Sequence, residues 1–273
     1  PKQTRPLSWL IEKFWPVPGW TDSDLATIKN SSISVSEIPS SVSCEPIKAP
    51  SEELTKGIVY YTDNRLDEKL AKQVQDHLKE SGLPIVSVSM KPLNFGQNIV
   101  INAERSYLTM FKQILAGIEA LNVDVLYLCE HDVLYSKEHF DFTPLTKDKF
   151  YYNKYNWQVR QSDGHSVYWD CKKVSQVCGY RDLMLKHYRE RVRKVELNGF
   201  SRRMGFEPGT HGRAERVDDT KSEFFKTTTP NLDIRHKHNL TSSRWSPTEF
   251  RNPCKNWTES HVNKLTGWED LIL

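Results

Sequence analysis

Residues 123–132, VDVLYLCEHD, join an apolar run to two carboxylates at its end. An apolar run of this kind is typical of a strand that is covered on both faces. Glu130 and Asp132 stand two residues apart, so both can reach the mouth of the sheet that contains this strand. Carboxylates in that position can hold a hard divalent cation against phosphate oxygens. The stretch therefore predicts a buried strand that ends in a cation site, with a solvated loop that carries two carboxylates as the alternative interpretation.

The sequence before this strand repeats strand and helix patterns. Short β-rich runs, GIVYYT and IVSVSM, occupy residues 57–62 and 85–90. Apolar residues at helical spacing from Leu66 to Leu78 separate them, and a second helix is expected at residues 102–121. The order strand, helix, strand, helix, strand favours right-handed crossovers. We therefore expect an α/β fold of Rossmann type, with a mostly parallel central sheet flanked by helices.

Composition excludes several classes of protein. Hydrophobic residues make up 37% of the 273 and charged residues 27%, which is typical of a globular chain and not of a disordered or collagen-like one. No stretch approaches the roughly 18 apolar residues of a membrane span. Phosphate-binding and dinucleotide-binding glycine loops are absent, which argues against a kinase or a dehydrogenase. Five cysteines without a Cys-x-x-Cys pair favour reduced thiols inside a cell.

The end of the apolar run resembles the glycosyltransferases of the GT-A fold. Glu130-His131-Asp132 follows the third strand, about seventy residues after the first, where that family places its Asp-x-Asp motif. The motif in the family binds a metal and grips the diphosphate of the donor. The resemblance covers roughly residues 56–240. It implies a nucleotide-sugar-binding half at residues 56–150 and an acceptor-binding half with the C-terminal segment at residues 151–273, after an N-terminal strap and linker at residues 1–55.

The resemblance also implies the metal ligands. Glu130 and Asp132 would bind Mn²⁺ or Mg²⁺, and a histidine from late in the chain would complete the metal shell. His236 is the first candidate for that histidine and His238 the second, since a neutral imidazole is a competent Mn²⁺ ligand. A surface His-Lys-His cluster without a ligand is the alternative interpretation of these residues.

Donor-binding residues are expected after the first two strands and late in the chain. In the resembling family, side chains after the first strand hold the base and ribose, here Thr62, Asp63 and Arg65. The loop after the second strand would line the same wall with Asn94, Gly96 and Asn98, although Gly96 can equally serve a turn. Arg235 and Arg244 would neutralise the leaving diphosphate. A UDP-sugar is the expected donor.

Aromatic residues crowd the sequence after Lys149. In the resembling family this half binds the acceptor, and Trp157 and Trp169 are the aromatic residues expected to stack on it. A hydrophobic core lined by the same aromatic residues is the alternative interpretation. A helix is predicted from Ser175 to Val192. Between Arg181 and Arg216 the chain carries ten Lys or Arg and five acidic residues, which would suit a phosphate-bearing acceptor such as DNA. A solvated helix face is the alternative interpretation of these charges.

The catalytic base of an inverting transferase would be a carboxylate in the acceptor half. Glu207 is the first candidate because Gly205, Pro208 and Gly209 would hold it on a defined turn. A cap of the following segment is the alternative role for Glu207. Asp170, beside Trp169, is the second.

These predictions combine into a metal-dependent glycosyltransferase that moves a sugar from a nucleotide-sugar donor to an acceptor hydroxyl. Some phage enzymes resemble this plan and glycosylate hydroxymethylated pyrimidines in DNA, so the acceptor is expected to be a glycan or DNA. The expected location is the cytoplasm of a bacterium or a phage-infected cell. Two other classes stay open: a nucleic-acid-binding protein without activity, and a metal-dependent phosphohydrolase or nuclease.

Overall fold

Residues 54–212 and 214–273 are described by a computed structural model. The strap and linker predicted at residues 1–55 fall almost entirely outside the described residues. Among the helices that the structure describes, none is both long and apolar enough to cross a bilayer.

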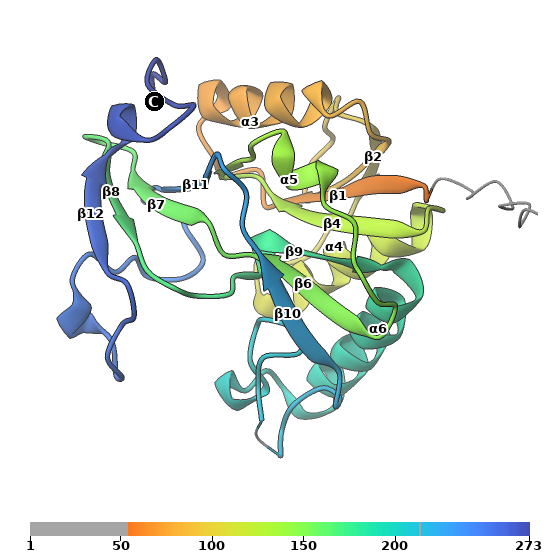
Figure 1. The fold of residues 1–273 in the computed structure, drawn as a ribbon. Coiled ribbons are helices and arrows are strands. Elements are labelled where there is room, and N and C mark those ends of the chain that lie inside the picture. Colours follow the sequence, from red (N-terminus) through yellow and green to blue (C-terminus); the bar gives the residue numbers. More distant parts are fainter. Residues whose placement is uncertain (1–53, 213) are drawn as a thin grey trace, which may run out of the picture. The chain divides into compact units, whose positions relative to one another are not determined.

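A seven-stranded sheet forms the centre of the described chain, in the order β10-β6-β9-β4-β1-β2-β3 (Figure 1). The first four strands along the sequence are mutually parallel: β1 (Lys56–Thr62), β2 (Ile85–Ser89), β3 (Gln97–Val100) and β4 (Val125–Glu130). β9 (Val177–Tyr180) is antiparallel to β4 and β6, while β6 (Lys149–Asn153) and β10 (Lys221–Phe225) pair in parallel. The predicted α/β class, with a mostly parallel central sheet, is confirmed. The boundary expected at residue 150 lies inside β6.

Helices cover both faces of this sheet. Side chains along β1 point alternately to the two faces, and each face presents apolar residues to its helices. Ile58 and Tyr60 share one core with α3 (Glu68–Glu80), whereas Val59 and Tyr61 share another with α4 (Tyr107–Ala120) and α6 (Arg181–Asn198). Figure 1 shows α3 on one side of the strands and α4 and α6 on the other. The carboxyl ends of β1 and β4 are left uncovered by these helices, as in other open parallel sheets.

A five-stranded sheet, in the order β12-β8-β7-β11-β5, lies beside the first. Its strands are β5 (Val133–Leu134), β7 (Asn156–Arg160), β8 (His165–Tyr168), β11 (Asn231–Arg235) and β12 (Thr258–His261). The short helix α5 (Glu138–Asp141) follows β5, and single 3₁₀ turns occupy Val174–Gln176, Arg202–Met204, Pro247–Glu249 and Val262–Lys264. β11 is antiparallel to β5, so the late chain returns to the end of β4.

The helix predicted from Ser175 begins instead at Arg181. Residues Val177–Tyr180 form β9, which pairs with both β4 and β6. A short apolar run has the same appearance in a strand and in a buried helix, and long-range pairing decides between them here. The helix then continues to Asn198 and ends at Gly199, whose φ of 72° favours glycine.

Candidate active site

Two parallel strand ends and one returning strand bring the site together. β1 and β4 pair in parallel with Tyr61 opposite Glu130, so Thr62 and Asp63 lie beside the residues that follow β4. On the other side, the carbonyl of Asp132 accepts a hydrogen bond of 2.8 Å from the N–H of Ile234. The residues after β11 are therefore held next to Asp132, although about one hundred residues separate them in sequence.

His131, Asp132 and His236 form the cluster that can hold a metal ion, with ligand atoms within 4.8 Å of one another. His236 Nε2 lies 3.4 Å from Asp132 Oδ2, and the His236 side chain is only 3% exposed. Nε2 has no hydrogen-bond partner among the described residues. Because a buried polar atom without a partner is costly, a cation at this point would satisfy it. The donor set of two imidazoles and a carboxylate fits a divalent transition metal.

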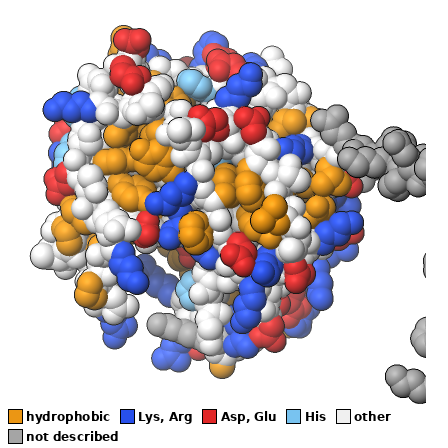
Figure 2. Space-filling model, in the orientation of Figure 1, with side chains coloured by type: hydrophobic (Ala, Val, Ile, Leu, Met, Phe, Trp, Pro, Cys, Tyr) orange, Lys and Arg blue, Asp and Glu red, His pale blue; other side chains and the backbone are white. Residues whose placement is uncertain are grey.

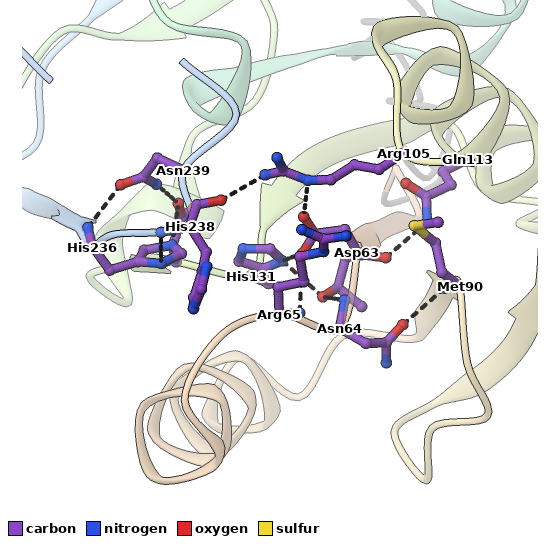
Figure 3. Close-up of polar contacts among 12 residues, drawn as sticks. Asp63, Asn64, Arg65, Met90, Arg105, Gln113, His131, His236, His238 and Asn239 are labelled. Atoms are coloured by element: carbon purple, nitrogen blue, oxygen red, sulfur yellow. Dashed lines mark hydrogen bonds and ion pairs between the residues drawn. The ribbon is translucent and has the colours of Figure 1, made fainter. Parts of the chain in front are cut away.

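The surroundings of His131 favour its role as a metal ligand (Figure 3). Its Nδ1 lies 2.7 Å from the hydroxyl oxygen of Thr62, the kind of contact that fixes the orientation of an imidazole ligand. Burial lowers the pKa of His131. The ring is therefore neutral at physiological pH, as a metal ligand must be.

Glu130 and His238, both predicted as ligands, lie outside this cluster. The Glu130 carboxylate accepts a hydrogen bond of 2.8 Å from the Tyr61 hydroxyl, and burial holds the pKa of Glu130 well above its usual range. His238 contributes its backbone carbonyl, which accepts a 2.5 Å hydrogen bond from Arg105 Nη2. Of the predicted ligands, the structure brings Asp132 and His236 together, with His131 as the third member. The acidic-x-acidic pattern predicts the two acids as metal ligands and does not predict His131 between them.

A cavity of about 600 Å³ lies at these strand ends. Nine of the residues selected from the sequence line it: Thr62, Asp63, Glu130, Asp132, Trp169, Glu207, Arg235, His238 and Arg244. Arg105 from the loop before α4 also lines it, and its Nε lies 2.5 Å from Asp63 Oδ2 (Figure 3). Arg244 forms no ion pair with any described residue and lies over the ring of Phe250 at 4.6 Å. The cavity therefore presents a cation that no carboxylate of the described chain neutralises.

Residues 91–98, the turn after β2 and the start of β3, do not line this cavity, whereas Met90 directly after β2 does. Asn98 accepts a hydrogen bond from the N–H of Leu93 and donates to the hydroxyl of Ser87, so its amide fixes the loop. Gly96 has a φ of 60°, and a Cβ atom there would lie 2.4 Å from the carbonyl oxygen of Ile85. Asn94 is exposed on the same turn. The wall expected from Asn94, Gly96 and Asn98 is thus a structural turn.

Four other predicted residues also lie outside the lining of this cavity: His236 of the cluster, Trp157, Asp170 and Arg65. Trp157 is 6% exposed and belongs to the core, so its ring presents no face to a ligand. Asp170 accepts hydrogen bonds from the Tyr168 hydroxyl and the Asn256 amide, which tie β8 to the C-terminal segment. Arg65 lines a separate cavity.

Asp233 and Lys173 belong to the cavity wall but were not selected from the sequence. Lys173 Nζ lies 3.1 Å from Asp233 Oδ2, and Arg235 Nη1 lies 3.2 Å from Asp233 Oδ1. Asp233 and Arg235 stand two residues apart on β11 and so share one face of the strand. That alternation is the signal that relates them in the sequence, whereas Lys173 is related to them only by the fold.

Several cations of the basic stretch at residues 181–216 pair with nearby carboxylates. Arg189 pairs with Glu119, Arg193 pairs with Glu190, and Arg203 pairs with Glu215. Arg191 is fully buried. Figure 2 shows side chains of both signs interspersed over the part of this face where α6 lies. These contacts favour the solvated-face interpretation of the stretch.

No protein-family model and no curated protein matches the sequence. Among solved structures, the chain is similar to a glycosyltransferase involved in the glycosylation of the major capsid of the virus PBCV-1, with 10% identity and a TM-score of 0.39, over 69% of this chain and 94% of that one. It is also similar to a mutant β-1,4-galactosyltransferase 7 from Drosophila in complex with manganese, UDP-Gal and xylobiose, with 12% identity and a TM-score of 0.36, over 72% of this chain and 79% of that one.

Proposed function

We propose that the protein is a metal-dependent glycosyltransferase that moves a sugar from a nucleotide-sugar donor, a UDP-sugar, to an acceptor hydroxyl. The observation that carries this proposal is the partly buried cluster of His131, Asp132 and His236 beside a large cavity at the carboxyl ends of β1 and β4. Open α/β sheets bind their ligands at this edge. The unpaired Arg244 in the cavity wall suits an anionic donor.

Different residues of the site would serve metal binding, proton transfer and nucleoside binding. A divalent cation on the cluster would stabilise the negative charge of the departing diphosphate. In the transfer step, the bond between the sugar C1 and the phosphate oxygen breaks, and its electron pair stays on the nucleoside diphosphate. The acceptor oxygen forms the new bond to C1, and its proton passes to the Glu207 carboxylate. Asp63 and Arg105 form the wall that would hold the nucleoside.

The cluster favours Mn²⁺ over Mg²⁺. Mg²⁺ prefers oxygen ligands in near-ideal octahedral geometry, and here two of the three protein donors are imidazoles. We expect Mn²⁺ to bind more tightly than Mg²⁺ to the metal-free protein. Calorimetric titration with each ion measures this difference.

Release of nucleoside diphosphate from UDP-glucose and UDP-galactose tests the function. We expect release with Mn²⁺, its loss with EDTA, and its recovery when Mn²⁺ is restored. Asp132→Asn should abolish both Mn²⁺ binding and release. Glu130→Gln is the matched control, since Glu130 lies outside the cluster, and it should retain Mn²⁺ binding. Release that survives EDTA and Asp132→Asn would refute the metal assignment, while cleavage of simple phosphate esters would favour a phosphohydrolase.

A further inference from the structure

A second cavity, of about 700 Å³, lies against the same segment of chain that carries the late histidines. Arg235 and His238 line both cavities, whereas His236 lines only the second. The metal cluster therefore stands between the two cavities, with His131 and Asp132 on the side of the first. Arg235 and His238 are therefore the residues at which the walls of the two cavities meet.

The walls of the second cavity carry four cations and one carboxylate. Arg65, Arg160, Arg235 and Lys237 are the cations, and Asp67 is the carboxylate. The Asp67 carboxylate is already engaged, since it accepts hydrogen bonds from two backbone N–H groups as the N-cap of α3. One carboxylate cannot balance four cations, so the lining residues of this cavity carry an excess of positive charge.

Two of these cations are available to a ligand. Arg235 is held by Asp233, and Arg160 Nε lies 2.8 Å from Asp163 Oδ1. Arg65 and Lys237 are exposed and form no ion pair with any described residue. Arg65 and His236 of the cluster line this same cavity. Two free cations match a phosphate monoester, which carries about −1.5 to −2 charges at pH 7, better than they match a carboxylate or a neutral sugar.

An aromatic wall adjoins these charges. The ring of Trp245 lines the cavity, with the guanidinium of Arg160 at 5.1 Å and the ring of His165 at 5.6 Å. An aromatic surface beside two unpaired cations suits a sugar that bears a phosphate group, because the ring contacts the apolar face of the sugar while the cations bind the phosphate.

We propose that the second cavity binds the phosphate group of a phosphorylated sugar, and that this sugar is the acceptor. The acceptor role rests on the proposed function, whereas phosphate binding does not. In that role, a hydroxyl oxygen of the phosphorylated sugar forms the bond to the donor C1, its proton passes to the Glu207 carboxylate, and the nucleoside diphosphate leaves. The phosphate of the acceptor stays intact.

Calorimetric titration of the full chain, in EDTA, with glucose 6-phosphate, inorganic phosphate and glucose tests the binding site. Glucose 6-phosphate should bind more tightly than inorganic phosphate, and glucose should bind at least tenfold more weakly than glucose 6-phosphate. Arg65→Gln and Lys237→Gln should each weaken glucose 6-phosphate binding by at least about fivefold, as expected for loss of one charge-assisted contact. Lys264→Gln is the matched control, because this exposed lysine lines neither cavity.

Three results would overturn the site: equal affinity for glucose and its phosphate, unchanged glucose 6-phosphate binding in both variants, or displacement of glucose 6-phosphate by UDP with Mn²⁺, which would assign the cations to the donor.

Mass spectrometry of a reaction with UDP-glucose or UDP-galactose, glucose 6-phosphate and Mn²⁺ tests the acceptor role, and a hexosylated sugar phosphate supports it. If glucose 6-phosphate binds and the donor is hydrolysed without transfer, the acceptor role is wrong. If the donor is never consumed, the proposed function fails while the phosphate site stands.

Discussion

Glu207 lies in the wall of the first cavity, and burial raises the pKa of its carboxyl group. A carboxylate with a raised pKa accepts a proton more readily near neutral pH, as a general base must. Glu207→Gln preserves the size of the side chain but removes this capacity. We expect kcat of sugar transfer to fall by about 10²- to 10⁴-fold, the usual contribution of a general base, with little change in the KM of the donor. Steady-state kinetics of the transferred sugar measures both.

Asp170 supplies the comparison for this prediction. Its carboxylate lies 3.4 Å from Lys154 Nζ and 3.8 Å from Lys226 Nζ, outside the cavity. Asp170→Asn should therefore act mainly on stability, lowering the free energy of unfolding by about 1–2 kcal/mol as a partly buried charged contact is lost. A large fall in kcat for Asp170→Asn with none for Glu207→Gln would reverse the two assignments.

At the scale of elements, local patterns predicted the first half of the fold. β1, β2, β4, α3 and α4 lie within a few residues of their expected ranges, because strand runs and helical spacing are properties of neighbouring residues. β9 and the pairing of β5 with β11 depend on residues far apart in sequence. The site divides in the same way. Asp132 was predicted from the acidic pattern at a strand end and His236 from the resemblance, but the roles of His131 and Asp233 depend on the placement of β11 beside β5.

The turn between β2 and β3 yields a prediction on stability. Gly96 and Gly82 both have positive φ, at 60° and 68°, but a Cβ at Gly96 would meet the Ile85 backbone while a Cβ at Gly82 would meet no atom within 4 Å. Gly82→Ala should cost about 1 kcal/mol from backbone strain alone. Gly96→Ala should cost a further 1–3 kcal/mol or so, as is typical of overpacking. Urea denaturation of the two variants measures the difference, and equal losses would contradict the role assigned to this turn.

At the scale of the whole molecule, one buried histidine joins the two sheets. His139 of α5 is fully buried, and its Nδ1 accepts hydrogen bonds from the amides of Asn153 in β6 and Asn231 in β11. Its Nε2 has no partner among the described residues. Protonation would place an unpaired positive charge between the sheets, so the stability of the assembled chain depends on keeping this ring neutral.

The pH dependence of unfolding follows from this requirement. Burial lowers the pKa of His139 from 6.5 to about 3. The unfolded chain binds a proton at this histidine below about pH 6.5, whereas the folded chain does so only near pH 3. Stability from the neutral ring is therefore complete above pH 6.5 and is lost as pH falls toward 3, by about 1.4 kcal/mol per pH unit. Urea denaturation from pH 7.5 to 4.5 measures the free energy of unfolding at each pH. As pH falls, this free energy should decrease by about 1.4 kcal/mol per pH unit less in His139→Gln than in the unsubstituted protein, with each protein compared with its own value at pH 7.5. Parallel curves for the two proteins would show that His139 does not couple protonation to unfolding.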